Sequence, residues 1–209
     1  MSKVTITFYG HSCFKVEANG SSVIFDPYEN GSVPGFLLPH GLEADIVSCS
    51  HEHADHNAEH LINTTGKEPG FKIRKQTVPH DHHNGALRGL SDITFIDLPD
   101  MTVVHLGDLG RLPTQTEYAL LSKADVILLP CAGHYTISSK EAAEIISHLT
   151  HPSLKILMHF REGKCGYDVQ ESISEVMEDI QGVKRLSDST ITIDDTAIPD
   201  EIITLKPAQ

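Results

Sequence analysis

The segment His51-Glu-His-Ala-Asp-His56 places three imidazoles and two carboxylates within six residues, directly after the apolar stretch Asp45-Ile-Val-Ser-Cys-Ser50. This stretch is rich in β-branched residues and predicts a strand. The histidine-rich segment therefore begins where a strand gives way to a loop or to the start of a helix.

The spacing within this segment suits metal ions. Alternate side chains of an extended chain share a face, so His51 and His53 can point at one ion. If the chain then turns into a helix, Asp55 and His56 project in new directions and can reach a second ion. Neutral imidazole and carboxylate suit Zn²⁺, Mn²⁺ or Fe²⁺ and need no thiolate. The segment therefore predicts a metal site at the end of a strand.

Length and composition indicate a soluble globular protein. The chain has 209 residues, 39% of them hydrophobic, and no Gly-, Ser- or Pro-rich linker divides it, so we predict one domain over residues 1–209. We recognise neither a transmembrane run nor a signal peptide, and four widely spaced cysteines fit a reducing compartment, so a cytoplasmic location is expected. The formal net charge of −13 argues against nucleic acid or an anionic membrane as a partner.

The first half of the chain is almost entirely β in character. Asn19-Gly20 and Leu98-Pro-Asp100 each separate two apolar runs and predict hairpin turns; both residues of the first pair tolerate positive φ. A short helix is expected over residues 58–62. The predicted strands of this half span residues 3–9, 14–18, 21–25, 71–78, 92–97 and 101–105.

A Gly- and Pro-containing loop runs from Asp26-Pro27 to about Gly41. Its apolar residues Phe36, Leu37 and Leu38 are expected to be exposed and are candidates for the border of a substrate cleft. The alternative is a surface loop that packs onto the core.

The second half alternates strands and helices. Residues 125–129 and 154–158 are typical of buried strands, and the capping box Ser138-Ser-Lys-Glu141 predicts the start of a helix. Asp168 and Glu171 are expected to cap a further helix. Residues 190–193 and 202–205 return to short strands. Two groups of strands with later helices predict two packed sheets covered by helices, a four-layer arrangement.

Chemistry-bearing residues follow several of the predicted strands, and strand ends at one edge of a sandwich converge in space. The candidates are the 51–56 segment, His80-Asp81, Gly107-Asp-Leu-Gly110 and Met158-His159. A site for two metal ions can be assembled from them.

These motifs resemble the metallo-β-lactamase superfamily, whose signature His-x-His-x-Asp-His is matched by the 51–56 segment. Within it, the chain is similar to small, largely uncharacterised metal-dependent hydrolases related to ascorbate-phosphate lactonases. The resemblance implies an α/β fold, the four-layer αββα sandwich. The further matches are Gly10-His-Ser-Cys-Phe14, Asp26-Pro27, His80-Asp81 with Arg88-Gly89, His105-Leu-Gly-Asp-Leu-Gly110, Gly133-His-Tyr-Thr-Ile137 and Met158-His-Phe160.

The resemblance also implies a ligand set. His51, His53 and His80 would hold one ion, and Asp55, His56 and His159 the other. Asp108 would bridge the two ions, and Asp55 and Asp108 would take part in catalysis. His82 and His83 stand close to His80, and a shift of strand register could exchange His80 with His82.

The expected cofactors are two divalent metal ions, with Zn²⁺ favoured and Mn²⁺ or Fe²⁺ as alternatives. Such a pair lowers the pKa of a bridging water, so that a hydroxide can attack a carbonyl or phosphoryl group at neutral pH. We therefore expect a hydrolase acting on a small-molecule lactone, amide or phosphate ester, and an anionic substrate is compatible with the sequence. The alternatives are a nucleic-acid phosphodiesterase, a di-iron redox or sensing protein, and a metal-stabilised binding module. A homo-oligomer is also compatible with the sequence.

Residues outside the ligand set have smaller predicted roles. Asp26 and His11 could hydrogen-bond metal ligands, or only local backbone. His105 is expected to be structural or to support a ligand. Three residues that follow strands could bind an anionic substrate: His134, Arg161 and Lys164. The alternative for Arg161 and Lys164 is a solvated loop charge.

Overall fold

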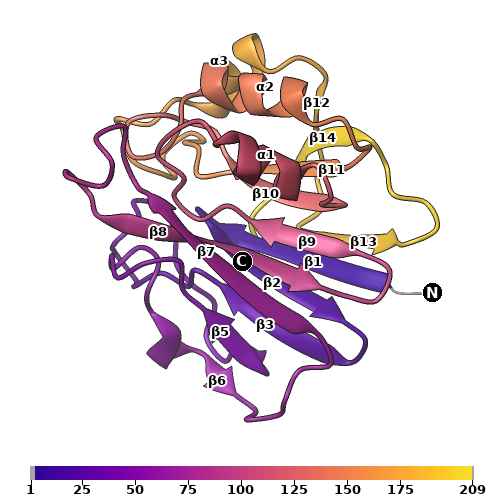
Figure 1. The fold of residues 1–209 in the computed structure, drawn as a ribbon. Coiled ribbons are helices and arrows are strands. Elements are labelled where there is room, and N and C mark those ends of the chain that lie inside the picture. Colours follow the sequence, from indigo (N-terminus) through magenta and orange to yellow (C-terminus); the bar gives the residue numbers. More distant parts are fainter. Residues whose placement is uncertain (1–2, 209) are drawn as a thin grey trace.

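Strands with alternating apolar residues form a five-stranded sheet in the computed structural model, which describes residues 3–208. In β1, Val4, Ile6 and Phe8 are buried, while the residues between them are half-buried. The buried face packs against a second sheet (Figure 1). In spatial order the strands are β13 (Thr190–Asp194), β1 (Lys3–Gly10), β2 (Cys13–Ala18), β3 (Ser21–Phe25) and β5 (Ile46–Ser48).

The second sheet has seven strands, and its centre is buried on both faces. Every residue of β10 and β11 is buried, as expected of parallel strands covered on two sides. In spatial order the strands are β12 (Val183–Arg185), β14 (Glu201–Thr204), β11 (Leu154–Met158), β10 (Val126–Pro130), β9 (Thr102–His105), β8 (Leu90–Asp97) and β7 (Lys72–Pro79). A separate pair is formed by β4 (Glu43–Ala44) and β6 (Asn63–Thr64).

Three helices cover the outer face of the seven-stranded sheet (Figure 1). They are α1 (Gln115–Leu121), α2 (Ser139–His148) and α3 (Ile173–Asp179), and each begins with a complete capping box. The caps satisfy backbone N–H groups that the first turn leaves without partners. Within residues 3–208, no helix is long and apolar enough to cross a membrane.

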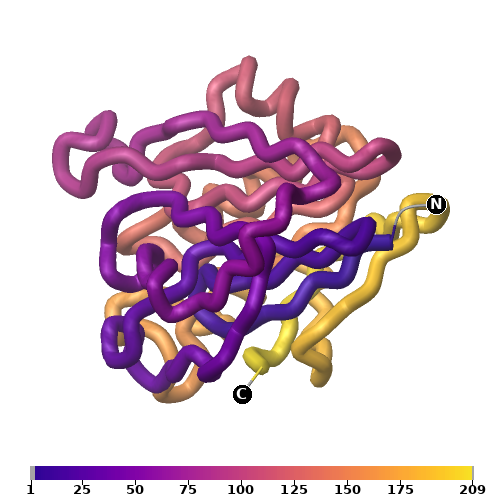
Figure 2. Tube along the Cα trace, turned by 90° about the horizontal axis from the view of Figure 1, so that it is seen from below, coloured from indigo at the N-terminus to yellow at the C-terminus, as the bar shows by residue number. Residues whose placement is uncertain are grey.

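The outer face of the five-stranded sheet is covered mainly by a loop. Tyr28, Val33 and Leu38 pack there against Ile24, together with the region of the single 3₁₀ turn η1 (Glu59–Leu61). Figure 2 shows this indigo segment on the side of the molecule opposite the helices. The predicted αββα sandwich is confirmed, with one outer layer that is mostly irregular.

Several local predictions are confirmed and two are wrong. The hairpin at Asn19-Gly20, the hairpin between β8 and β9, and the helix after Ser138 are all present. The helix predicted to start at Asp168 instead begins after Ser172, which caps it with Glu175. The short helix expected over residues 58–62 forms only the 3₁₀ turn η1, and the described residues of the first half contain no α-helix.

Candidate metal centre

The strands that precede the candidate site residues run in matching directions. In the five-stranded sheet, β2 is antiparallel to β1 and to β3, and β5 is parallel to β3, so β1, β3 and β5 end at the same edge. In the other sheet, β7, β9, β10 and β11 are likewise co-directional. Their carboxyl ends carry, in chain order, His11, Asp26, the 51–56 segment, His80, Asp108 and His159.

One group of side chains, the imidazole cluster, consists of His51, His53 and His80. Their candidate ligand atoms lie within 4.8 Å of one another, and His51 Nε2 lies 2.9 Å from His53 Nδ1. His80 is buried, His51 is half-buried and His53 is exposed. The imidazole cluster therefore opens toward solvent.

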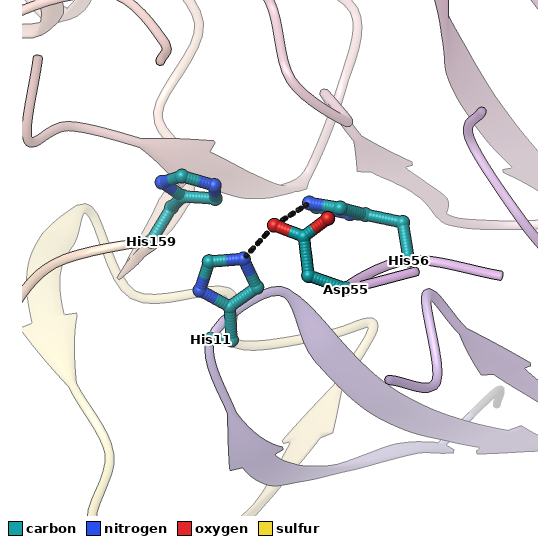
Figure 3. Close-up of side chains that lie close together, drawn as sticks. All are labelled: His11, Asp55, His56 and His159. Atoms are coloured by element: carbon teal, nitrogen blue, oxygen red, sulfur yellow. Dashed lines mark hydrogen bonds and ion pairs between the residues drawn. The ribbon is translucent and has the colours of Figure 1, made fainter. Parts of the chain in front are cut away.

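A second group, the mixed cluster, consists of His11, Asp55, His56 and His159 (Figure 3). These ligand atoms also lie within 4.8 Å of one another. Asp55 Oδ2 is 3.2 Å from His11 Nε2 and 3.6 Å from His56 Nε2. The three histidines are buried and only the carboxylate is half-buried, so the mixed cluster lies deeper than the imidazole cluster.

Asp108 lies between the two clusters. Its Oδ2 atom is 3.4 Å from Nε2 of His80, 3.3 Å from Nε2 of His56 and 3.2 Å from Nε2 of His159. Ligand atoms around one tetrahedral ion with bonds of about 2.1 Å lie roughly 3.4 Å apart. One carboxylate oxygen thus has the spacing of a ligand shared by both clusters.

Buried polar atoms at this centre have no hydrogen-bond partner within residues 3–208. They include His56 Nε2, His159 Nε2 and Asp108 Oδ1. An orphaned buried polar atom is costly, and several that converge on one place call for a ligand or ion. Imidazole nitrogens and carboxylate oxygens are donors that Zn²⁺ and related divalent ions accept, so the residues fit such ions.

Asp26 supports the ligand rings from behind. Its Oδ2 atom accepts a hydrogen bond from His56 Nδ1 at 2.8 Å and another from Ser50 Oγ at 2.7 Å. Ser50 Oγ in turn lies 2.9 Å from His51 Nδ1. One buried carboxylate therefore orients a ring in each cluster, as outer carboxylates do in histidine metal sites.

Two further residues, which the sequence did not single out, hold the mixed cluster. Tyr167 donates its hydroxyl to Asp55 Oδ2 at 3.1 Å and to Ser32 O at 2.9 Å. The amide nitrogen of Gln170 lies 2.6 Å from His159 Nδ1 and donates to the His159 carbonyl at 3.0 Å. Both residues come from the segment after β11, and no local sequence signal marks them.

The backbone at the centre is tightly constrained. A Cβ atom on Gly110 would lie 2.1 Å from the Asp81 nitrogen, so this position needs glycine for the Asp108 loop to pack on the backbone after His80. Three non-glycine residues at strand ends adopt positive φ: His11 at 55°, Asp26 at 42° and His159 at 62°. Such conformations cost of order 1–3 kcal/mol each and cluster at functional sites.

Burial and neighbouring charges set the protonation of the site. The pKa of His51 falls to about 3, because burial and nearby His56 disfavour its charged form. Burial raises the pKa of Asp108, but the imidazoles of His159 and His56 outweigh it and hold this pKa well below its usual range. Burial lowers the pKa of His56, whereas the carboxylates of Asp108 and Asp26 raise it well above the usual value. An ion would therefore meet a neutral His51 and an ionised Asp108, and would displace a proton from His56.

Comparison with known proteins identifies the family. Residues 5–159, most of the chain, match the model of the β-lactamase superfamily domain. The chain belongs to the metallo-β-lactamase superfamily.

Relatives of this superfamily member carry the name UPF0173 metal-dependent hydrolase. One from Staphylothermus marinus is 25% identical over 98% of this chain and 96% of its own length. One from Carboxydothermus hydrogenoformans is 24% identical over 74% of this chain and 84% of its own length. A crystal structure of a candidate zinc-dependent hydrolase from Thermotoga maritima, 24% identical, has the same fold, with a TM-score of 0.74 over 97% of this chain and 98% of the other. These relatives are thus named metal-dependent hydrolases, and this metallo-β-lactamase-type chain carries His/Asp clusters that could hold metal.

In this metallo-β-lactamase-type chain, the structure brings together all seven residues of the predicted ligand set. It places His80, and not His82, in the imidazole cluster: His82 is exposed and its Nε2 lies 2.6 Å from Glu141 Oε1. His83 is also exposed.

The remaining candidates lie outside the clusters. His105 is buried between Ser12 O, which lies 2.9 Å from its Nε2, and the ring of Phe25. Arg161 pairs with Glu175 at 3.7 Å. Lys164 and His134 are exposed.

The apolar residues of the 27–41 loop, Phe36 to Leu38, do not line the candidate metal centre. Leu37 is 75% exposed, but Leu38, expected to be exposed, is buried. These residues line an apolar cavity of about 870 Å³ between Phe8, Phe160 and the end of the chain at Leu205–Ala208, and none of the seven ligand candidates lines it. The cavity is therefore separate from the metal centre.

Proposed function

We propose that this protein is a dinuclear metal-dependent hydrolase acting on a small molecule. His51, His53 and His80 hold one divalent ion, Asp55, His56 and His159 hold the other, and Asp108 lies between them. The observation that carries this proposal is the position of Asp108 Oδ2, within 3.4 Å of imidazole nitrogens from both clusters.

Zn²⁺ is the favoured ion, with Mn²⁺ or Fe²⁺ as alternatives, because the donors are all imidazole and carboxylate. Two bound ions supply hydroxide at neutral pH and a Lewis acid for the scissile carbonyl or phosphoryl oxygen. The chain supplies the orientation. Asp26 fixes the rings of His56 and, through Ser50, His51. Tyr167 fixes the Asp55 carboxylate. A dedicated nucleophilic side chain is not required for this chemistry.

The substrate proposed is a small lactone, amide or phosphate ester. The net charge of −13 disfavours long-range attraction of RNA or DNA, which argues against a nucleic-acid phosphodiesterase. The alternative is a redox or sensing protein that holds two iron ions. The identity of the bound metal, measured together with hydrolytic activity, distinguishes this alternative from a hydrolase.

The test is the metal content and hydrolytic activity of Asp108→Asn beside wild type. Elemental mass spectrometry on protein purified without chelator or a histidine tag should give about two equivalents in wild type. The variant should hold fewer ions, because it loses the Asp108 carboxylate charge that both ions would share. Its turnover should fall by about a thousandfold or more. The activity screen uses lactones, amides and phosphate esters with the metal found.

Asp100→Asn is the matched control, since Asp100 is exposed in the hairpin turn between β8 and β9. It should keep both the metal and the activity. A wild-type protein that takes up neither Zn²⁺ nor Mn²⁺ would refute the proposal. Two irons with visible absorption and no hydrolysis would support the redox alternative instead.

A further inference from the structure

The loop that follows the candidate ligand His80 is held rigidly by one carboxylate. Asp81 accepts hydrogen bonds from four backbone N–H groups of this loop, and the loop closes where His80 N donates to Gly89 O at 3.0 Å. The last residue before the closure is Arg88. The four donors are the backbone nitrogens of His83, Gly85, Leu87 and Arg88, at 2.7, 3.0, 2.9 and 2.8 Å. Arg88 is thereby fixed one residue from the base of the loop, beside the imidazole cluster.

Arg88 differs from the other four arginines of the chain. Each of those pairs with a carboxylate, in a protein that has 29 acidic residues. Among residues 3–208, no carboxylate forms an ion pair with Arg88. The four pairs are Arg74 with Asp97, Arg111 with Glu117, Arg161 with Glu175 and Arg185 with Glu162. The half-buried Arg88 side chain thus keeps the N–H donors of its planar guanidinium available for a ligand.

A row of rings connects Arg88 to the mixed cluster. Its guanidinium lies over the ring of Tyr135, 5.4 Å from the ring centre. The Tyr135 ring packs edge-on against Tyr167 with centres 5.2 Å apart, and the Tyr167 hydroxyl donates to Asp55 Oδ2 at 3.1 Å. Arg88 is therefore tied to the imidazole cluster through its loop and to the mixed cluster through two tyrosines. Its guanidinium is thus near both clusters without contacting a candidate ligand directly.

We propose that Arg88 binds an oxyanion, a carboxylate or a phosphate, that belongs to the substrate and lies apart from its scissile bond. This inference rests on the proposed hydrolase function. A guanidinium stacked on an aromatic ring keeps its edge free for bidentate hydrogen bonds to such a group. In a strongly acidic protein, an unpaired cation near a site that would hold two divalent ions also attracts anions locally. The substrate class is then an anionic lactone, amide or ester.

Hydroxamates are suitable probes, because the hydroxamate group chelates protein-bound metal whatever the natural substrate is. A series of dicarboxylic acid monohydroxamates with chains of two to six carbons is compared with the same series ending in a primary amide. Affinity for the metal-loaded protein is measured by calorimetry. At one or more chain lengths, wild type should bind the carboxylate about tenfold more tightly than the amide.

Arg88→Gln should abolish that preference and leave the affinity for the amide probes unchanged, which also shows that the variant is folded and loaded with metal. Arg88→Lys should keep part of the preference, because it keeps the charge and loses the bidentate geometry. Arg74→Gln, the same change near the opposite end of β7, should keep all of it.

The outcomes separate the two proposals. Absence of a carboxylate preference in wild type, or its persistence in Arg88→Gln, would overturn the role of Arg88 while the hydrolase proposal stands. If neither series binds the metal-loaded protein, the proposed metal centre fails, and the role of Arg88 falls with it.

Discussion

The imidazole cluster and the mixed cluster share Asp108 but differ in charge, depth and support. The imidazole cluster offers three rings and no carboxylate of its own, and one of the rings is exposed. The mixed cluster offers a carboxylate and buried rings, held by Tyr167 and Gln170. A charged and preorganised ligand set binds a divalent ion more tightly than a neutral and solvated one. The two proposed ions are therefore expected to differ in affinity, with the tighter ion in the mixed cluster.

Removing one histidine ring from either cluster should have the largest effect on metal affinity. If the two clusters are equivalent, the two variants will lose metal equally, which would contradict the expected difference. His56→Ala should lower the affinity of the mixed cluster by more than about 100-fold, since losing a ligand exceeds the effect of losing an outer partner. His53→Ala should release only the weaker ion and keep one equivalent. Metal retained after dialysis against a graded series of chelator concentrations measures both. Equal loss in the two variants would show that the ions bind as one unit.

Changing the support behind the rings should have a smaller effect. Asp26→Asn weakens the hydrogen bonds to His56 and, through Ser50, to His51, and should reduce affinity for both ions by about 10- to 100-fold. Ser50→Ala removes the contact with His51 and one hydrogen bond to Asp26, but it leaves the contact between Asp26 and His56 in place. It should therefore weaken the imidazole cluster more than the mixed cluster. Competition with a fluorescent zinc chelator measures the affinities of the tighter and the weaker ion separately. If the tighter ion binds to Asp26→Asn as strongly as to wild type, Asp26 does not support the mixed cluster.

The smallest effect is expected at Asp81, which supports the loop after His80 without touching a cluster. Burial raises the pKa of this carboxyl, but its backbone hydrogen bonds outweigh burial and bring the pKa to about 2. A carboxyl whose pKa is lower in the folded state stabilises the protein above its unfolded pKa, near 4, and loses this contribution as pH falls through 2. Asp81→Asn should thus lower the free energy of unfolding at pH 6 and flatten its decline between pH 4 and 2. Urea unfolding of metal-free protein at several pH values measures this, and parallel curves for both proteins would exclude the predicted linkage.

Local signals predicted much of the fold, and the failures have physical causes. Thr114 and Glu117 form the capping box that begins α1, a helix that was not predicted. The pairs Asp168 with Glu171 and Ser172 with Glu175 both have capping-box spacing. The second pair is selected because it buries Ile173 and Val176, which follow it, against the seven-stranded sheet. Tertiary packing decided between two local patterns of similar strength.

The part of the site formed by residues adjacent in sequence could be predicted. Contacts between residues that are far apart in sequence could not. The 51–56 segment carries its own spacing, whereas the choice of His80 over His82 depends on how the chain turns after β7. The contacts of Tyr167 with Asp55 and of Gln170 with His159 join segments whose proximity no sequence period encodes. Such contacts follow only from the complete topology.

The positive φ angles of His11, Asp26 and His159 have a consequence for how this protein can change. Glycine at any of these positions would relieve backbone strain of order 1 kcal/mol, and would at the same time delete a side chain of the centre. Each of these glycines would also leave buried polar partners without a contact and would add freedom to the unfolded chain, which offsets the relief of strain. The three positions therefore keep their side chains at the expense of backbone strain, and glycine there should weaken metal binding without a large gain in heat resistance.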